Sequence, residues 1–379
     1  MTRVLICGAG KVGVATAAVF SQFPDYDVYL ADNQFDDLDV NQWLQKQAKI
    51  RTIAIDVKQT ESLIEYCKKH AIDVIVSTLV AGMNKSIIET AIACQIHYVD
   101  CSPKIVDIDE QKHGDILNSK SAFLPNCGLA PGWTGIIANA FMQQMEEAIS
   151  CQVQVGVIAD EMTHSLSGSA KRFIHELTEY ASIIEQGRLI QRMPLSEVSM
   201  LQIDGRTFET THAANGYGHL MSLWQNKASN LVYQTLMPVG MAEKIQFLIQ
   251  ALRLHEQAEN MRQLLASVFN RQPKDALWVR IKCTGKSQSL PKTLSFKQVI
   301  QPISIAHYQL SSLQISTAIG IASVVDMICQ SPHRYQGLIA QETLDFQSWL
   351  SNRFTQLLIK QDSFNHQQED QSSLLNTTL

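Results

Sequence analysis

The feature of this sequence that most constrains its fold is a glycine-rich turn close to the first residue. The six residues from 8 to 13 read GAGKVG and follow directly on the apolar run Val4–Cys7. Such a turn between a buried strand and a helix brings backbone N–H groups and the positive end of the helix to a pyrophosphate. We therefore expect a dinucleotide-binding domain, with phosphate contacts from Gly8, Gly10, Lys11, Val12 and Gly13.

An acidic residue after the second predicted strand bears on which dinucleotide binds. Asp32 follows the apolar segment 27–31, and no arginine occurs among residues 33–37. A carboxylate at this position accepts hydrogen bonds from the ribose hydroxyls of NAD and repels the 2′-phosphate of NADP. The sequence therefore favours NAD as the cofactor, with NADP the less favoured alternative.

The first 130 residues alternate short Val- and Ile-rich runs with amphipathic segments. Strands are expected at 4–7, 27–31, 51–55, 73–77, 97–99 and 122–124, and helices at 11–22, 61–70 and 85–94. This alternation predicts an α/β fold with a doubly wound parallel sheet, the Rossmann arrangement. Ligands bind such sheets beyond the carboxyl ends of the strands. Further cofactor contacts are therefore expected from Asp56, Val57, Ser77, Thr78 and Leu79. Asp56 fits a helix-capping role equally well.

The pattern changes near Pro131. Strands with alternating polar and apolar residues are predicted at 151–157, 276–286 and 292–300, and helices at 170–186, 241–254 and 257–269. This pattern is typical of a half-solvated sheet in an α+β domain. The apolar segment 311–329 predicts a helix that can pack against the first domain. The predicted division is 1–130, 131–305, 306–360 and a polar tail, 361–379, that is expected to be disordered.

Charge and cysteine usage exclude several classes of protein. The chain of 379 residues has 18% charged residues and a net charge of −5. It lacks the dominant basic field that nucleic acid or an anionic membrane surface would require. The eight cysteines include no CxxC pair and no Cys/His cluster at metal-binding spacing, so no metal site is expected. We expect a cytoplasmic protein with free thiols and no membrane-spanning segment.

Polar residues after the later predicted strands are candidates for contact with the nicotinamide or the substrate. Asp100 would either take a proton, with its pKa raised by burial, or serve as a cap. Cys101 and Cys127 would line the pocket or simply pack in the core. The turn that contains Gly128 and Pro131 is expected to face the cofactor, because a glycine-rich turn before a helix exposes N–H groups.

Two residues of the second domain are candidate substrate contacts. Arg172 lies near an expected helix start and could pair with a substrate carboxylate, although a solvated first turn is the alternative. His212 lies beside a glycine-rich loop, where it would act as a general base or as a hydrogen-bonded structural residue.

Several segments resemble the saccharopine dehydrogenase-like family, in particular its lysine 6-dehydrogenase branch. The resemblance rests on the order and spacing of GAGKVG (8–13), HYVDCS (97–102), NCGLAPG (126–132), EY (179–180), QGR (186–188), NG (215–216), VYQTL (232–236) and GLIAQE (337–342). It implies a Rossmann domain, an inserted α+β domain for substrate binding and dimerisation, and a C-terminal return to the Rossmann domain. It also implies hydride transfer between a nicotinamide and a carbon that bears an amine, in a homodimer.

One departure from the family pattern affects the expected substrate site. The family commonly places an arginine and a histidine where this chain has Met237 and Met241. Because methionine cannot pair with a carboxylate, another basic residue does that job, the substrate is less anionic, or activity is lost. The resemblance thus leaves three functions open. The first is an NAD(P)-dependent oxidoreductase for an amino acid-derived or polyamine-like amine. The others are a carboxynorspermidine synthase-type imine reductase and a non-catalytic NAD-binding sensor or scaffold.

Overall fold

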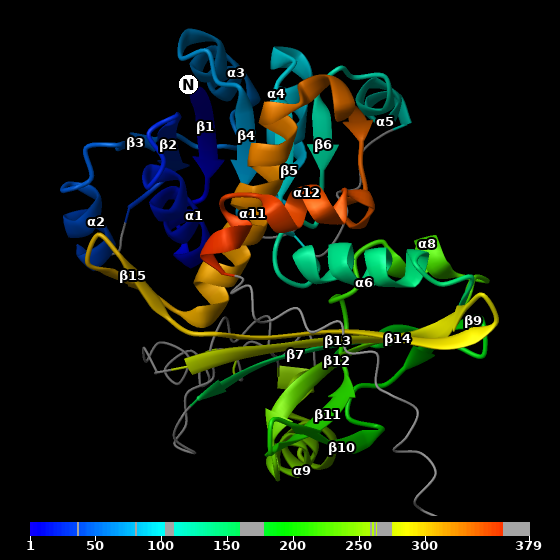
Figure 1. Cartoon of the computed structure of the whole chain (residues 1–379). Coiled ribbons are helices and arrows are strands. Elements are labelled where there is room, and N and C mark those ends of the chain that lie inside the picture. The colour runs from blue at the N-terminus through cyan, green and yellow to red at the C-terminus, as the bar shows by residue number, and fades with distance from the viewer. Residues whose placement is uncertain are drawn as a thin grey trace, which may run out of the picture. The chain divides into compact units, whose positions relative to one another are not determined.

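The computed structural model describes residues 1–35, 38–79, 82–102, 110–159, 178–257, 260, 263 and 275–358. These residues form two compact units, whose elements are labelled in Figure 1. Unit 1 comprises Met1–Ile136, Gln272–Asp275 and Ile300–Leu358, and the described part of unit 2 falls within Ile137–Arg271 and Ala276–Val299. Unit 1 therefore collects segments from both ends of the described chain.

Unit 1 contains a seven-stranded sheet in the order β17-β6-β5-β4-β1-β2-β3, with every neighbouring pair parallel. This is the doubly wound parallel sheet predicted, and the six strands predicted in the first 130 residues are confirmed to within two residues at each end. The strand order reverses between β1 and β4, where doubly wound sheets bind their ligands. The strands are β1 (Thr2–Cys7), β2 (Tyr26–Asp32), β3 (Ile50–Ala54), β4 (Val74–Ser77), β5 (His97–Asp100), β6 (Ala122–Leu124) and β17 (Gly337–Leu338).

Helices cover the strands of this sheet, which explains why the central strands are apolar on both faces. One core cluster joins Leu5, Ile75, Tyr98 and Phe123 from four strands with Ile87 from a helix, and none of the five is more than 2% exposed. The predicted helices 11–22, 61–70 and 85–94 are confirmed as α1, α3 and α4. The helices of the first half are α1 (Lys11–Ser21), α2 (Leu38–Leu44), α3 (Thr60–Lys69), α4 (Lys85–Cys94), α5 (Glu110–Leu117) and α6 (Trp133–Gln143).

The C-terminal segment returns to this sheet, as expected. Helix α11 (Ser312–Gln330) starts at a capping box in which Ser311 and Gln314 exchange side-chain and backbone hydrogen bonds. It packs along α1, β17 then pairs with β6, and α12 (Phe346–Ser351) follows (Figure 1). By length and composition α11 would suit a membrane span, but 83% of its apolar window is buried inside the protein. It is therefore accounted for as a core helix.

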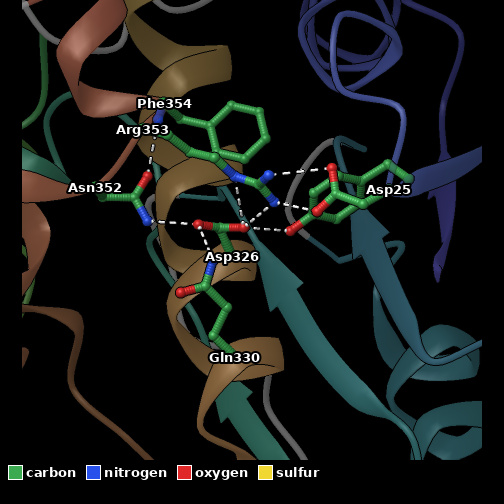
Figure 2. Close-up of polar contacts among 7 residues, drawn as sticks. Asp25, Asp326, Gln330, Asn352, Arg353 and Phe354 are labelled. Carbon is green, nitrogen blue, oxygen red and sulfur yellow. Dashed lines mark hydrogen bonds and ion pairs between the residues drawn. The ribbon is translucent and has the colours of Figure 1, made fainter.

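Two ion pairs of Arg353 connect the end of this return to the N-terminal half of unit 1. Figure 2 shows Arg353 between Asp326 on α11 and Asp25 just before β2. The guanidinium donates to Asp326 Oδ1 at 2.7 Å and to both carboxylate oxygens of Asp25 at 2.6 and 3.1 Å. Asp326 is 1% exposed and also accepts from the hydroxyl of Tyr26 at 2.7 Å and from the amide of Asn352 at 2.8 Å.

Unit 2 is built around a mixed sheet in the order β10-β11-β12-β7-β13-β14, with β8 paired to β12 and β9 to β8. Strands β7 and β12 are parallel, whereas β10, β11 and β12 form antiparallel pairs. The predicted strands 151–157, 276–286 and 292–300 are confirmed within β7 (Glu147–Ala159), β13 (Asp275–Ser287) and β14 (Leu290–Ile300). The others are β8 (Ala181–Glu185), β9 (Arg188–Arg192), β10 (Val198–Ile203), β11 (Arg206–His212) and β12 (Ala228–Pro238), with short helices α8 (Leu220–Trp224) and α9 (Met241–Gln246). In unit 1, β15 (Ile303–Ile305) and β16 (Tyr308–Leu310) form a separate ribbon.

The structure corrects two predicted helices of unit 2. The helix predicted over 170–186 is wrong at its end, where residues 181–185 form β8. Gln186 and Gly187 both have positive φ, as a tight two-residue hairpin turn requires, so cross-strand pairing with β9 prevails over the helical pattern. The helix predicted over 241–254 is α9 followed by a π-helical turn, Phe247–Ala251. Residues 170–177, most of the helix predicted over 257–269, and the tail 361–379 lie outside the described residues.

Candidate functional site

The glycine-rich turn joins β1 to α1 where the strand order reverses. Gly8 has a φ of +106°, and a Cβ at Gly13 would lie 1.8 Å from the Gly8 carbonyl oxygen, so neither position accommodates a side chain without a shift of the turn. Gly10 is exposed, with nothing within 4 Å of its Cβ position. It precedes Lys11, which is exposed, and Val12, which is half-buried, in the first turn of α1. The turn thus offers an uncrowded helix N-terminus, which a pyrophosphate requires.

Asp32 lies beside this turn at the carboxyl end of β2. Its Oδ2 atom accepts a hydrogen bond from the backbone N–H of Ala9 at 2.5 Å, and Oδ1 accepts from Asn33 N–H at 2.7 Å. A carboxylate retains lone pairs for further donors, including the hydroxyls of a ribose. The structure therefore brings together the glycine turn and the acidic residue, which lie about 20 residues apart in the dinucleotide-binding pattern.

Asp56 and Val57, the predicted contacts after β3, are engaged with the protein. Asp56 is exposed, and its Oδ1 atom accepts from the backbone N–H of Lys58 at 3.0 Å. Val57 is buried, and its carbonyl accepts from the hydroxyl of Ser86 at 2.7 Å. Asp56 therefore closes a turn ahead of α3 but does not cap that helix, whose N-cap residue is Gln59; an adenine contact stays a prediction.

The predicted contacts at the carboxyl end of β4 are Ser77, its last residue, and Thr78 and Leu79, which follow it. Thr78 Oγ1 donates to the carbonyl of Gly8 at 3.0 Å, directly behind the turn. Ser77 Oγ donates to Asn84 Oδ1 at 2.7 Å and accepts from the backbone N–H of Leu79 at 3.4 Å. Because both hydroxyls are engaged with the protein, these residues would offer a cofactor mainly their backbone and the Leu79 side chain.

Asp100 is held in a saturated hydrogen-bond environment at the carboxyl end of β5. It is 1% exposed, and Oδ2 accepts from the hydroxyl of Tyr98 at 2.6 Å. Oδ1 accepts from both the backbone N–H and the hydroxyl of Ser102 at 2.8 Å. Burial raises the pKa of this carboxyl, as predicted, while the bonds from Tyr98 and Ser102 act in the opposite direction. The geometry supports a structural role for Asp100 over that of a proton acceptor.

The neighbouring cysteines and the 128–132 turn are buried to different degrees. Cys101 is half-buried, whereas Cys127 is fully buried and burial raises the pKa of its thiol, which suits core packing better than reactivity. Gly128 and Pro131 are buried, and a Cβ on Gly320 of α11 would lie 2.2 Å from the Gly128 carbonyl oxygen. The turn therefore packs tightly against α11, and its contact with a cofactor stays a prediction.

Of the two candidate substrate contacts in the second domain, the structure describes only His212. Arg172 lies outside the described residues. His212 belongs to unit 2, where it is 6% exposed at the end of β11 with Nε2 3.4 Å from Glu197 Oε2. A carboxylate partner suits both a positioned base and a structural histidine, so its role stays a prediction. Within the described ranges, no group of three or more His, Cys, Asp or Glu side chains is placed to hold a metal ion.

The two methionines that depart from the family pattern form part of an apolar cluster beneath α9. Met237 is 5% exposed and packs with Leu195, Ala242, Ile245 and Ile249, and Met241 packs against the same cluster. The start of α9 is held by Glu209, whose carboxylate oxygens accept from the N–H groups of Gly240 and Ala242 at 2.8 Å each. Local packing thus accounts for both methionines.

Sequence reasoning missed two asparagines that bond to Ser102, the neighbour of Asp100. Asn84 is fully buried and connects Ser77 to Ser102, and Asn126 donates to the carbonyl of Ser102 at 2.5 Å. The available signal was the position of Asn84 directly before a predicted helix, which indicates an N-cap. Its side chain makes no capping bond in the structure, so the signal alone would have given the wrong role.

Comparison with known proteins agrees with this fold. The family model of the saccharopine dehydrogenase NADP binding domain matches residues 4–121. Saccharopine dehydrogenase (L-Glu forming) from Saccharomyces cerevisiae superposes with a TM-score of 0.72 at 14% identity, covering 90% of this chain and 94% of that one. Homospermidine synthase from Legionella pneumophila, in complex with NAD, has a TM-score of 0.64 at 11% identity, covering 92% and 88%. Unit 1 thus contains an NAD(P)-binding domain, and the chain has the fold of saccharopine dehydrogenase.

Proposed function

We propose that unit 1 binds NAD in preference to NADP. The carrying observation is the carboxylate of Asp32, which lies at the glycine turn with Oδ2 2.5 Å from Ala9 N. A 2′-phosphate beside this carboxylate would be repelled, whereas two ribose hydroxyls would find acceptors. The matched family model is described as an NADP binding domain. The preference for NAD is therefore argued from Asp32 of this chain and not from the family model.

The chemistry we propose is NAD-dependent oxidation or reduction at a C–N bond of an amino acid-derived amine or imine. The family domain and the fold of saccharopine dehydrogenase support this class of reaction. The nicotinamide, when bound, supplies or accepts the hydride. In this chain the glycine turn and Asp32 would bind and orient the dinucleotide, Asp100 would hold the nearby strand ends, and Arg172 and His212 are the candidates for substrate carboxylate and proton. The proposed setting is a cytoplasmic homodimer.

Gly10 provides a test of the cofactor site that leaves the fold intact. Its φ is −72°, and a Cβ there would meet nothing within 4 Å. Gly10→Ala should therefore leave thermal stability unchanged, but its methyl group would occupy the space where a pyrophosphate approaches the backbone. Isothermal titration of the full chain should show NAD binding weakened roughly tenfold or more. This corresponds to a loss of about 1.4 kcal/mol or more of binding free energy.

The matched control is Gly114→Ala, which also meets nothing within 4 Å, has no positive φ and lies in α5, away from the turn. It should leave NAD affinity unchanged and should not lower stability. Equal NAD affinity in wild type and Gly10→Ala would remove the glycine turn as the phosphate site. Absence of NAD and NADP binding in the wild type would remove the proposed function itself.

The substrate class is tested by following NADH absorbance in both directions. Lysine, saccharopine and carboxylated polyamines would serve as amines, and mixtures of amino aldehydes with amines as sources of imines. Turnover only in the reductive direction would favour the imine reductase of the carboxynorspermidine synthase type, an interpretation with which the homospermidine synthase fold agrees loosely. NAD binding without turnover on any of these compounds would favour the sensor or scaffold.

A further inference from the structure

A continuous line of hydrogen-bonded side chains lies at the carboxyl edge of the parallel sheet. Ser77 Oγ donates to Asn84 Oδ1 at 2.7 Å, Asn84 Nδ2 donates to Ser102 Oγ at 3.4 Å, and Ser102 Oγ donates to Asp100 Oδ1 at 2.8 Å. The hydroxyl of Tyr98 completes the line at Asp100 Oδ2. We call these five residues the edge network; none of them is more than 3% exposed.

The edge network fixes backbone segments that lie beyond the last paired residues of the strands. The ladder between β4 and β5 ends with the pair Ser77 and Asp100. Beyond this pair, one backbone bond joins the two strand ends, from the N–H of Cys101 to the carbonyl of Ser77 at 3.3 Å. The N–H of Leu79 donates to Ser77 Oγ, and Asn126 donates from its side chain to the carbonyl of Ser102. The network thus couples the ends of β4 and β5 to the loop after β6.

Asn84 has the central place in this coupling. It is 0% exposed and is the member that joins the β4 side to the β5 side, accepting from Ser77 and donating to Ser102. A buried amide is costly unless both of its ends are bonded. Strand pairing does not require it, because the backbone ladder already joins β4 to β5. Its two hydrogen bonds join the side chain of Ser77 at the end of β4 to that of Ser102 just after β5.

Ser77 and Ser102 lie at the carboxyl ends of β4 and β5, on the β5 side of the glycine turn, and ligands of doubly wound sheets lie beyond the carboxyl ends of the strands. The glycine turn and Asp32 serve the pyrophosphate and the adenosine half on the proposed function, which leaves the β4 and β5 ends for the nicotinamide half. We propose that Asn84 is a positioning residue that aligns these two strand ends, through Ser77 and Ser102, for the nicotinamide half of the dinucleotide. The proposal rests on the proposed NAD function.

The test compares NAD with ADP-ribose, which contains the same adenosine and pyrophosphate but no nicotinamide. Binding of both to full-length wild type and Asn84→Ala is measured by isothermal titration. The expected result is a loss of roughly tenfold in NAD affinity, the scale of one buried hydrogen bond, with ADP-ribose affinity changed by less than about twofold. The matched control is Asn118→Ala, which removes an exposed bond to Gly114 O outside the network and should change neither affinity.

The ratio of the two affinities separates positioning from general destabilisation. Equal weakening of NAD and ADP-ribose, or no change in either, would overturn the proposal. If wild type bound neither ligand, the proposed function would fail instead. If Asn84→Ala does not fold, Asn84→Asp and Ser77→Ala are measured in its place. Asn84→Asp keeps the acceptor for the hydroxyl of Ser77, and Ser77→Ala removes only one end of the edge network. A normal NAD to ADP-ribose ratio in both would then overturn it.

Discussion

Removal of the Asp326 carboxylate should destabilise unit 1 far more than removal of its neighbour Asp25. Both side chains pair with Arg353, but Asp326 is 1% exposed and Asp25 is 50% exposed. Asp326→Ala would leave the hydroxyl of Tyr26 and the amide of Asn352 buried without their acceptor, and each such group costs about 1–3 kcal/mol. Arg353 is less affected, since it retains Asp25 and access to water.

The expected change in the free energy of unfolding is therefore about 2–6 kcal/mol for Asp326→Ala, the sum for two buried groups left without an acceptor. Asp25→Ala removes a solvent-exposed pair and should cost about 1 kcal/mol or less. Urea unfolding of the full chain, followed by fluorescence, would measure both, and Trp349 is a buried reporter whose indole N–H bonds to Ser323 of α11. Equal costs for the two variants, or a cost below about 1 kcal/mol for Asp326→Ala, would refute this reasoning.

Two further variants probe the nucleotide edge. Gly13→Ala would place a Cβ 1.8 Å from the Gly8 carbonyl oxygen; it should abolish NAD binding and lower stability by about 1–3 kcal/mol, which calorimetry would check. Burial raises the pKa of Asp100 in the folded state. Between the ordinary aspartate pKa and this raised pKa, the folded state holds a proton that the unfolded state has lost, so the stability of the protein falls as pH rises through this range. Asparagine does not titrate, so the free energy of unfolding of Asp100→Asn should rise relative to that of wild type as pH increases above the ordinary aspartate pKa. A difference between the two proteins that does not change with pH would contradict this.

Much of the fold of unit 1 could be predicted because its signals are local. Apolar runs on β1, β4 and β5, separated by amphipathic helices, specify buried parallel strands without knowledge of their partners. The hairpin of β8 and β9 escaped prediction because residues 181–185 also fit a helical pattern. Pairing with β12 and a tight turn at Gln186-Gly187 decided between the two.

The candidate site, like the fold, has a part that could be predicted from the sequence and a part that could not. The sequence by itself determined the glycine turn between β1 and α1 and the place of Asp32 at the end of β2, because both follow from local backbone patterns at fixed offsets along the chain. Only the tertiary structure decided that Asp100 is saturated with hydrogen bonds, that Met237 belongs to an apolar cluster, and that Asn84 joins two strand ends. The physical reason is that burial and hydrogen-bond partners arise between residues distant in sequence, and only folding brings those residues into contact.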